Sequence, residues 1–597
     1  MSLFRQLLIA NSRKKKRPYY CEVEYLEGTG TQYINTGMVS TEQSAVDVIF
    51  GLSDITQASS TNGAIFGGRN SQTNRTFTLF YIASTTPQYF RFDFNGQVNV
   101  GKGTEIAIDT TSKYEFKYEN SKRTMSNITT NETVEAGLIP ATTFTTTPII
   151  LFSVNTNGGG NPSNVFAGTY FKGRIYSYKY SDGVNSIDLI PVLDWDMTPC
   201  MYDKVSGEFF YNQGTGDDFL YGREIHQVEY LESTGTQYID TGITQNSNIK
   251  AELSIYPTVI NKFIFGSRIS AGSDGFGIFM HSNNGGSWYP FFNAASTMIP
   301  GFVVNKKYDI TFSKDGLFVN NQLLEGPYTS VFSGKLNIYL FGMNTNGTVD
   351  NRLYIGKIYS TKLYENDILV RNYIPAVDEN GVGFMFDRVS HTIFNNAGTG
   401  VFNYPPIELE YLETSGGPCI DTGIKPTDEY GYHIRNTYRY KGGEQCAIGA
   451  MDAGNRFVGV YTGGIQISGG WGSFVGYLKS SYKFTDDTIW DVYCNYKNDR
   501  QIIVNDEFLK DLTDVHIDGT LTNTIYLFGR HYGNNVTKMY GRIYSTEITK
   551  GSDVVAHFIP VLKDGQLGMW DKINEVFYPN AGTGTFIGGK IVESEEE

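Results

Sequence analysis

Short runs in which apolar and polar residues alternate follow one another along the chain. In residues 335–342, "KLNIYLFG", Leu336, Ile338 and Leu340 recur at every second position, a period that predicts a β-strand with one buried face. Residues 91–100, "RFDFNGQVNV", hold two such runs around an Asn-Gly pair, which accepts positive φ angles and predicts a hairpin turn. No segment has the pattern of a long helix, so the chain is expected to be all-β.

Three motifs recur three times in the same order. The opening motif is "VEYLEGTGTQYINTG" (23–37), "VEYLESTGTQYIDTG" (228–242) and "LEYLETSGGPCIDTG" (409–423). The middle motif is "GRIYSYKYS" (173–181), "GKIYSTKLY" (356–364) and "GRIYSTEIT" (541–549). The closing motif is "MYDKVSGEFFYNQGTG" (201–216), "MFDRVSHTIFNNAGTG" (385–400) and "MWDKINEVFYPNAGTG" (569–584). Units of this length are too long for solenoid repeats, and each predicts one complete domain.

We predict three tandem two-sheet β-sandwiches of jelly-roll type. The chain of 597 residues is too long for one hydrophobic core. The domains are placed at 19–222, 223–405 and 406–590, with a basic arm at 1–18 and an acidic tail at 591–597.

Composition narrows the function classes. The 66 glycines, 42 tyrosines and 39 phenylalanines favour short strands and tight turns. A formal net charge of −14 argues against nucleic acid as the partner of the main body. Five cysteines without paired spacing and seven histidines outside any ligand cluster predict neither a disulfide framework nor a metal site, and we expect no cofactor and synthesis in a reducing cytoplasm. No apolar run approaches the roughly 18 residues that span a bilayer, so no membrane insertion is expected.

Two Asp-Thr-Gly tripeptides, at 240–242 and 421–423, raise the question of an aspartic protease. The first repeat has Asn35 at the same position, so the position tolerates loss of the carboxylate, and the two tripeptides lie in separate domains. We therefore reject the protease and predict strand ends whose Asn or Asp side chains bond nearby backbone amides before a glycine turn.

A glycosidase would need two carboxylates flanking the sugar bond. Glu22, Glu24 and Glu27 come nearest to such a pair, but they lie in the repeated opening strand and are interpreted as a solvated edge. We expect no catalytic residue, and a polysaccharide-degrading enzyme is the alternative to a binding protein.

One aromatic residue recurs at a fixed offset after an apolar-Gly pair in each domain: Tyr89, Trp288 and Trp471. A ring on a sheet face can stack on a sugar, so these residues are candidate carbohydrate platforms. The alternative is that the rings cover part of the sandwich core. Arg69 and Arg268 follow the same pairs and are candidate ligand donors, or partners of local carboxylates.

The opening "EYLESTGTQYIDTG" and the closing "FDRVSHTIFNNAGTG" resemble the concanavalin A-like, laminin-G-like jelly-roll modules of phage and prophage structural proteins of gut bacteria. The resemblance covers nearly all of residues 20–590. The segment "MSLFRQLLIANSRKKKR" resembles the short basic leader on virion proteins of gut Bacteroidetes phages, including crAss-like phages. The resemblance implies a head or tail fibre on the virion surface, made in the host bacterial cytoplasm, with lectin-like modules that bind host surface polysaccharide.

The arm is expected to attach the protein to a capsid or tail protein of the same virion, rather than to remain an unbound tail. Its candidate contact residues are Leu3, Phe4, Arg5, Leu7, Leu8, Arg13, Lys14, Lys15, Lys16 and Arg17. A homo-oligomer is expected, and a purely structural capsid or tail component is a further alternative. Relatives of the fold often bind calcium through loop carboxylates and carbonyls. Asp203, Asp387 and Asp571 in the closing motif are each a lone acid followed by Lys or Arg, which predicts a turn cap and leaves calcium binding as an open alternative.

Overall fold

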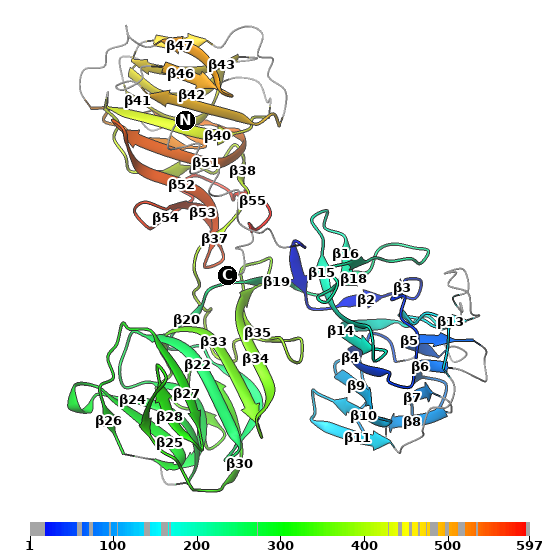
Figure 1. Ribbon diagram of the computed structural model, residues 1–597. Coiled ribbons are helices and arrows are strands. Elements are labelled where there is room, and N and C mark those ends of the chain that lie inside the picture. The colour runs from blue at the N-terminus through cyan, green and yellow to red at the C-terminus, as the bar shows by residue number, and fades with distance from the viewer. Residues whose placement is uncertain are drawn as a thin grey trace. The chain divides into compact units, whose positions relative to one another are not determined.

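Figure 1 shows the computed structural model of the chain. It describes residues 18–55, 62–70, 76–94, 97–103, 105–136, 144–156, 165, 169–270, 273–295, 297–427, 429–439, 444–452, 456–463, 466–472, 474–477, 487–495, 501–511, 520–532 and 535–592. Within these ranges the only helical element is a single 3-10 turn, η2 (Asn283–Gly285), and every other element is a β-strand. The predicted arm at 1–18 falls almost wholly outside the described residues.

The strands form three sandwiches of two sheets each. In the first sandwich, the first sheet has the order β11 (Glu132–Ala136), β10 (Lys122–Asn127), β9 (Lys113–Glu119), β4 (Ala45–Leu52), β14 (Gly173–Ser181), β15 (Ser186–Leu193), β16 (Pro199–Asp203) and β17 (Phe209–Phe210). The second sheet has the order β3 (Ile34–Asn35), β12 (Ile150–Leu151), β5 (Gly63–Arg69), β6 (Thr76–Ile82), β7 (Tyr89–Phe94) and β8 (Gln97–Lys102), with β13 (Asn155–Thr156) beside β5.

The second sandwich repeats this order. Its first sheet runs β29 (Gln322–Glu325), β28 (Gly316–Val319), β27 (Tyr308–Ser313), β22 (Ile249–Pro257), β33 (Ile355–Glu365), β34 (Ile368–Val377), β35 (Gly383–Asp387) and β36 (Thr392–Phe394). Its second sheet runs β21 (Ile239–Asn246), β30 (Ser333–Leu340), β23 (Phe263–Ser270), β24 (Ser273–His281), β25 (Ser287–Ala295) and β26 (Ile299–Pro300), with β31 (Asn344–Thr345) and β32 (Thr348–Val349) at one side.

The third sandwich has the same arrangement. Its first sheet runs β47 (Glu507–Asp511), β46 (Gln501–Val504), β45 (Trp490–Asn495), β40 (Tyr430–Asn436), β51 (Tyr540–Lys550), β52 (Asp553–Lys563), β53 (Gln566–Asp571) and β54 (Val576–Pro579). Its second sheet runs β39 (Ile420–Asp421), β48 (Tyr526–Leu527), β41 (Glu444–Asp452), β42 (Arg456–Gly463), β43 (Gln466–Gly472) and β44 (Phe474–Tyr477), with β49 (Gly529–Tyr532) and β50 (Asn535–Lys538). The remaining strands are β1 (Cys21–Val23), β2 (Leu26–Gly28), β18 (Leu220–Tyr221), β19 (Glu224–Gln227), β20 (Leu231–Thr234), β37 (Ile407–Glu408), β38 (Leu412–Ser415) and β55 (Ile587–Gly588). The predicted all-β jelly-roll fold is confirmed.

Aromatic rings from both sheets fill the core of the first sandwich. Phe66 of the second sheet packs on Phe116 and Tyr178 of the first, with ring centroids 6.4 and 5.6 Å apart, and all three side chains are fully buried. Burying such rings contributes strongly to stability because each removes a large apolar area from water. All five cysteines are buried and none forms a disulfide, which is usual for cysteines that pack as small apolar residues.

The tyrosine of the middle motif is an extra residue in the central strand of each first sheet. The register between β14 and β4 shifts between Ile175 and Ser177, and the corresponding shifts bracket Tyr359 in β33 and Tyr544 in β51. At this β-bulge the strand changes one neighbour: β14 pairs with β2 before the bulge and with β15 after it. A bulge bends its strand and redirects the side chains that follow.

The predicted strand end is found at Asn35 in β3 and at Asp421 in β39, whereas β21 continues past Asp240 to Asn246 with a shift of register after Asp240. The Oδ1 atoms of Asn35, Asp240 and Asp421 accept a hydrogen bond from the glycine amide two residues on, at 2.9–3.0 Å. Those three glycines have φ angles of +71°, +67° and +70°, a region that glycine enters without strain. The side chains therefore fix a turn.

Each closing hairpin is held by its buried aspartate. Asp387 accepts hydrogen bonds from the amides of Asn372, Val389 and Ser390 and from the Ser390 hydroxyl, at 2.6–3.1 Å. Asp203 and Asp571 have equivalent contacts. The predicted turn cap is confirmed.

We expect Asp387→Ala to lower the free energy of unfolding by about 2–4 kcal/mol, because it leaves several buried N–H groups without an acceptor. Asp309→Ala, on the exposed face of β27, should change it by less than about 0.5 kcal/mol. Chemical denaturation of both full-length variants measures the difference, and equal midpoints would contradict the capping role.

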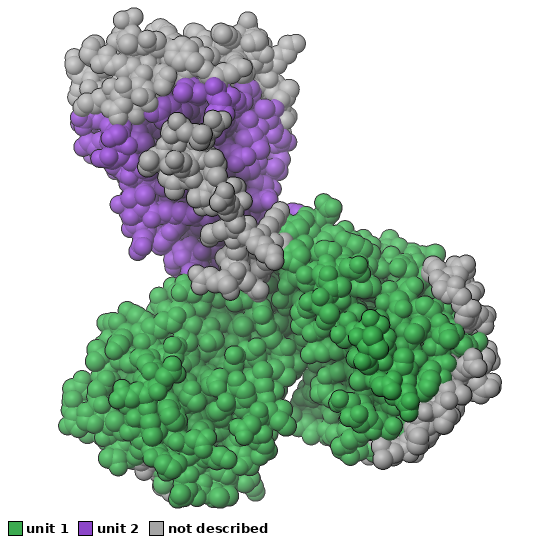
Figure 2. All heavy atoms as spheres, viewed as in Figure 1, with its two compact units in different colours: residues 1–379, 383–400, 595–597 green, residues 380–382, 401–594 purple. Residues whose placement is uncertain are grey.

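The chain divides into two compact units (Figure 2). Among the described residues, unit 1 covers 18–379 and 383–400, and unit 2 covers 380–382 and 401–592. Unit 1 holds the first and second sandwiches, and unit 2 holds the third. The long segment of unit 2 begins at Val401, and the sequence predicted the third domain at 406–590.

Within unit 1, the first and second sandwiches are joined by shared strands. β1 pairs with β15 of the first sandwich and also with β19, which pairs with β34 of the second. Beside this pairing, the Lys113 ammonium lies 3.9 Å from the centre of the Tyr176 ring and donates hydrogen bonds to Glu24 Oε1 at 3.2 Å and to the His391 carbonyl at 2.9 Å. Burial lowers the pKa of Lys113 to about 8.

The solvated edge predicted for Glu22, Glu24 and Glu27 is wrong. Their side chains are only 13%, 19% and 17% exposed. Each forms an ion pair with a residue that the repeat pattern did not place beside it. The partners are Arg388 of the second sandwich at 3.7 Å, Lys113 at 3.2 Å and Arg174 at 2.8 Å.

His391 lies buried at this junction, at the turn between β35 and β36. Burial lowers its pKa to about 3, with further lowering by Lys204, Lys179, Lys113 and Arg388. The imidazole is therefore neutral in the folded protein at pH 7.

The unfolded chain binds a proton at His391 near pH 6.5 and the folded chain only near pH 3, so this group destabilises unit 1 progressively as the pH falls between those values. The loss reaches about 4 kcal/mol at pH 3. We expect His391→Asn, which suits the positive φ of 47° at this position, to remove this component from the pH dependence of unfolding. Parallel stability curves for the two proteins would contradict it.

Candidate functional site

The structure describes the surroundings of four of the five predicted sugar-binding residues. Trp288 of β25 is 2% exposed and packs edge-on against Phe302 and Tyr308, with ring centroids 4.9 and 5.0 Å apart. A stacking platform needs a ring face open to solvent. The prediction of a platform at Trp288 is therefore wrong, and the alternative, a core residue, holds there.

The other described candidates differ in their exposure and in what they contact. Tyr89 is partly exposed at the start of β7, beside the cluster of Ala64, Phe80, Ile82 and Val154, and Trp471 lies in β43, where the side chains fall outside the described part of the structure. The Arg268 guanidinium lies 3.4 Å from Asp350 and over the rings of Phe263 and Phe291.

Arg69 of β5 is half-buried, and this burial lowers its pKa, an effect that the nearby Asp93 opposes. The two arginines thus lie beside local carboxylates, as the alternative interpretation had it.

A row of alternating charges crosses the outer face of the first sheet of the first sandwich. Register pairs Asp47 of β4 with Lys117 of β9 on one side and with Lys179 of β14 on the other, and Lys179 with Asp188 of β15. We call these four residues the charged row. Their neighbours in sequence, such as Tyr118 and Tyr180, are buried, so the period of two places the charged row on the outer face.

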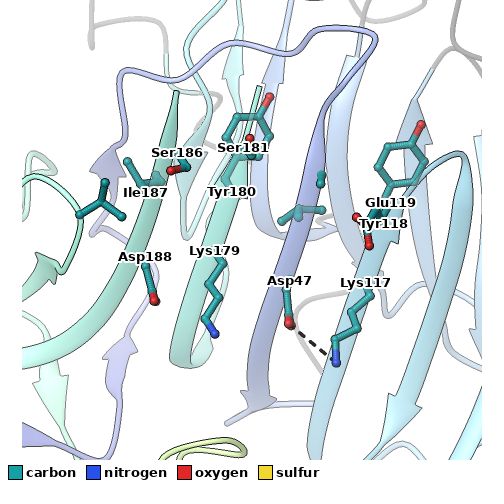
Figure 3. Close-up of a pocket in the computed structure, with 13 residues that line it drawn as sticks. Asp47, Lys117, Tyr118, Glu119, Lys179, Tyr180, Ser181, Ser186, Ile187 and Asp188 are labelled. Carbon is teal, nitrogen blue, oxygen red and sulfur yellow. Dashed lines mark ion pairs between the residues drawn. The ribbon is translucent and has the colours of Figure 1, made fainter. Parts of the chain in front are cut away.

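The charged row borders a hollow of 370 Å³. Figure 3 shows Lys117, Asp47, Lys179 and Asp188 extending in the same direction from four neighbouring strands. The hollow is also lined by Ser181 and Ser186 at the strand ends and by Val205 of the closing hairpin. Its wall thus offers carboxylates, ammonium groups and hydroxyls within a few strand spacings.

Ion pairs satisfy the charged row only in part. The Lys117 ammonium lies 3.7 Å from Asp47 and 2.7 Å from Glu115, and Lys204 lies 3.1 Å from Asp188 Oδ2. Asp188 Oδ1 is buried without a hydrogen-bond partner among the described residues. A buried acceptor of this kind is costly unless water or a ligand supplies a donor.

Burial sets the electrostatics of Asp47. Desolvation raises its pKa to about 6, Lys117 and Lys179 oppose the rise, and Glu115 adds to it. Above that pH the carboxylate is charged and accepts hydrogen bonds, so the charged row combines two acceptors and two donors at pH 7.

The positions equivalent to the charged row hold other residues in the second and third sandwiches. The second sandwich has Thr311, Glu252, Lys362 and Asn372 there, and the third has Tyr493, His433, Glu547 and His557. The fold therefore does not require the charged row.

The sequence analysis did not find the charged row, because its members come from four strands that are adjacent only after folding. The sequence does contain one local signal: Glu115, Lys117 and Glu119 alternate with the buried Phe116 and Tyr118. This alternation predicts that the three charged residues lie on an outer face, but it does not predict which strands lie next to that face.

No family model matches the sequence, and no curated protein matches it. Among solved structures, domains LG4-5 of the mouse laminin alpha1 chain align with 60% of this chain and 93% of their own at 12% identity and a TM-score of 0.22. The LG1-3 region of the laminin alpha2 chain aligns with 92% of this chain and 98% of its own at 9% identity and a TM-score of 0.24. The NanB sialidase of Streptococcus pneumoniae aligns with 94% of this chain and 99% of its own, at 11% identity and a TM-score of 0.19. Similarities of this size transfer no ligand or activity to the chain.

Within the described residues, the structure has no helix long and apolar enough to cross a membrane.

In the third sandwich, the corresponding row holds a charged histidine. His433 Nε2 lies 2.5 Å from Asp491 Oδ1 and its Nδ1 lies 3.8 Å from Glu547 Oε2. Burial lowers its pKa, but the bonds to Asp491 and Glu547 outweigh that effect and raise the value to about 9. The pKa of the neighbouring His557 is lowered by burial.

Because the folded pKa of His433 is above the unfolded value of 6.5, its contribution to stability is complete below pH 6.5 and disappears as the pH rises through 9. The contribution is at most about 3 kcal/mol. We expect His433→Gln to abolish the loss of hydrogen-exchange protection in β40 and β51 between pH 6.5 and 9, measured after correction for intrinsic exchange rates. His557→Gln, whose histidine has a lowered pKa, should retain that loss.

Proposed function

We propose that the chain is a binding protein of a phage virion surface whose lectin-like sandwiches contact polysaccharide on the host. The charged row of the first sandwich is the proposed contact site. The observation that carries the proposal is the hollow at that row, in which Asp188 Oδ1 is buried without a partner among the described residues.

The chemistry of the charged row suits a sugar. Carbohydrate hydroxyls donate to carboxylates and accept from ammonium groups, and the row offers both at the spacing of neighbouring strands, about 4.8 Å. Hydrogen bonds to charged groups contribute about 1.5–3 kcal/mol each. A shallow site of this kind binds weakly, and linked or oligomeric copies would raise the avidity by about 10²–10⁴.

The virion part of the proposal rests on the sequence resemblance. In it, the arm at 1–18 attaches the protein to a capsid or tail protein, the sandwiches face outward, and the particle carries a homo-oligomer. Tyr89 and Trp471 stay candidate contacts of the first and third sandwiches.

The test is co-elution of the full-length protein with a panel of purified host capsular polysaccharides on a sizing column. We expect Asp47→Asn and Lys179→Met each to weaken binding by about tenfold, the equivalent of one lost charged hydrogen bond. Binding should also weaken below pH 6, where Asp47 becomes protonated.

The matched control is a pair of substitutions at the equivalent positions of the second sandwich. Glu252→Gln and Lys362→Met change the positions equivalent to Asp47 and Lys179 in the second sandwich and should leave binding at the wild-type level. Equal losses in both sets would contradict a site at the charged row, and a polysaccharide peak that moves to smaller size would identify a hydrolase instead. If no polysaccharide of the panel co-elutes, glycan binding is contradicted for those hosts.

A further inference from the structure

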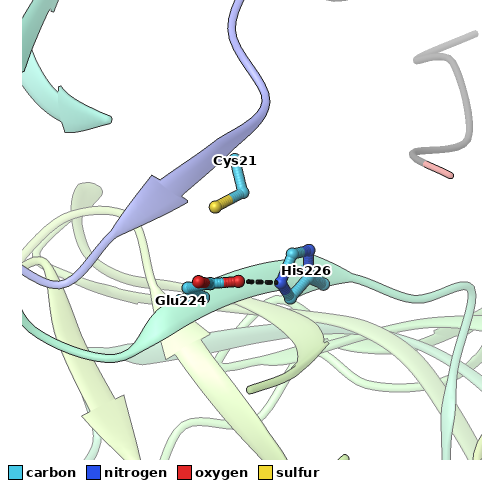
Figure 4. A group of neighbouring side chains, drawn as sticks. All are labelled: Cys21, Glu224 and His226. Atoms are coloured by element: carbon cyan, nitrogen blue, oxygen red, sulfur yellow. Dashed lines mark hydrogen bonds and ion pairs between the residues drawn. The ribbon is translucent and has the colours of Figure 1, made fainter. Parts of the chain in front are cut away.

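Three side chains with metal-binding atoms meet where the first and second sandwiches share strands. Cys21 comes from β1, and Glu224 and His226 come from β19 (Figure 4). β1 and β19 run antiparallel, with Glu22 opposite Ile225 and Val23 opposite Glu224. Residues 224 and 226 are two apart on one strand and therefore lie on the same face, and Figure 4 shows the Cys21 sulfur on that side.

The ligand atoms of this cluster lie within 4.8 Å of one another. His226 Nε2 is 2.8 Å from Glu224 Oε2. Around one zinc ion, with bonds of about 2.0–2.3 Å, the ligand atoms would be about 3.5 Å apart. Changes of about one ångström in the separations between the ligand atoms would therefore place all three around one ion.

Burial makes this an enclosed site. Cys21 is 0% exposed, and the side chains of His226 and Glu224 are 1% and 12% exposed. A thiolate, an imidazole and a carboxylate form a donor set that zinc accepts in proteins. The charge of an enclosed cation would balance the negative charge of the carboxylate and the thiolate that bind it.

We propose that Cys21, Glu224 and His226 form a zinc site at the junction of the first two sandwiches. The fourth position would be filled by water, as in zinc sites with three protein ligands. The ion would connect β1, at the edge of the first sandwich, to β19, which pairs with the second. This role is structural and independent of the proposed glycan site.

The experiment is a Co²⁺ titration of the full-length protein after removal of metal by a chelator. We expect one Co²⁺ per chain, with the near-ultraviolet charge-transfer absorption of a thiolate ligand, and displacement of Co²⁺ by Zn²⁺. Cys21→Ser should lose the charge-transfer absorption. Because changes in residues that merely orient ligands cost about 10- to 100-fold in metal affinity, Glu224→Gln should weaken binding by at least that much.

The control is Cys200→Ser, which changes another buried cysteine of the first sandwich, packed against Ile190 and Val192, and should retain the absorption. Zinc should raise the melting temperature of the wild type and of Cys200→Ser but not of Glu224→Gln. The proposal is overturned if the wild type gives no thiolate absorption, or if Cys21→Ser retains it. Should Cys21→Ser fail to fold, unchanged Co²⁺ affinity in Glu224→Gln overturns it alone. None of these readouts involves a glycan, so they are separate from the test of the proposed function.

Discussion

The bulge in the central strand of each first sheet is the constraint from which the other features follow. Tyr176 is the extra residue in β14, and the strand changes its neighbour from β2 to β15 at that point. The pairing on one side of the bulge brings Glu27 beside Arg174, and the pairing on the other side brings Lys179 beside Asp188. A strand without the extra residue would carry its later side chains on the opposite face.

The same tyrosine also bears on the junction within unit 1. The Lys113 ammonium lies over its ring, and the same ammonium donates a hydrogen bond to the His391 carbonyl of the second sandwich. In the third sandwich, Arg435 lies over the equivalent ring of Tyr544 at 5.5 Å. One repeated backbone irregularity thus supports a cation–ring contact that the first sandwich extends into a contact between domains.

The sequence predicted those features that depend on neighbours along the chain. The sequence predicted the strands and the turns, because turn chemistry and a period of two are local signals. The predicted turns are the hairpin at 91–100, the turn caps at Asp203, Asp387 and Asp571, and the glycine turns after Asn35, Asp240 and Asp421. A threefold repeat strengthened each of them, since a position that tolerates Asn in place of Asp is not a catalytic acid.

The remaining features depend on which strands become neighbours. Trp288 and Tyr89 occur at the same offset after an apolar-Gly pair, but this offset does not predict whether a ring points outward or into the core. In the structure, Phe302 and Tyr308 cover Trp288. The charged row and the Cys21 cluster combine residues from strands far apart in sequence. Spacing rules for cysteine and histidine find ligands on one loop or helix, and they do not find a pair such as Cys21 and His226.

The pairing of β1 with both β15 and β19 affects the entropy that the first two sandwiches lose when they bind to one surface. A flexible linker would let two domains sample orientations independently, and each would lose its own rotational freedom on meeting a surface. Strands common to two sheets restrict that independence within unit 1. β19 is hydrogen-bonded to both β1 and β34, so part of the entropy of aligning the second sandwich with the first on a surface is already lost during folding.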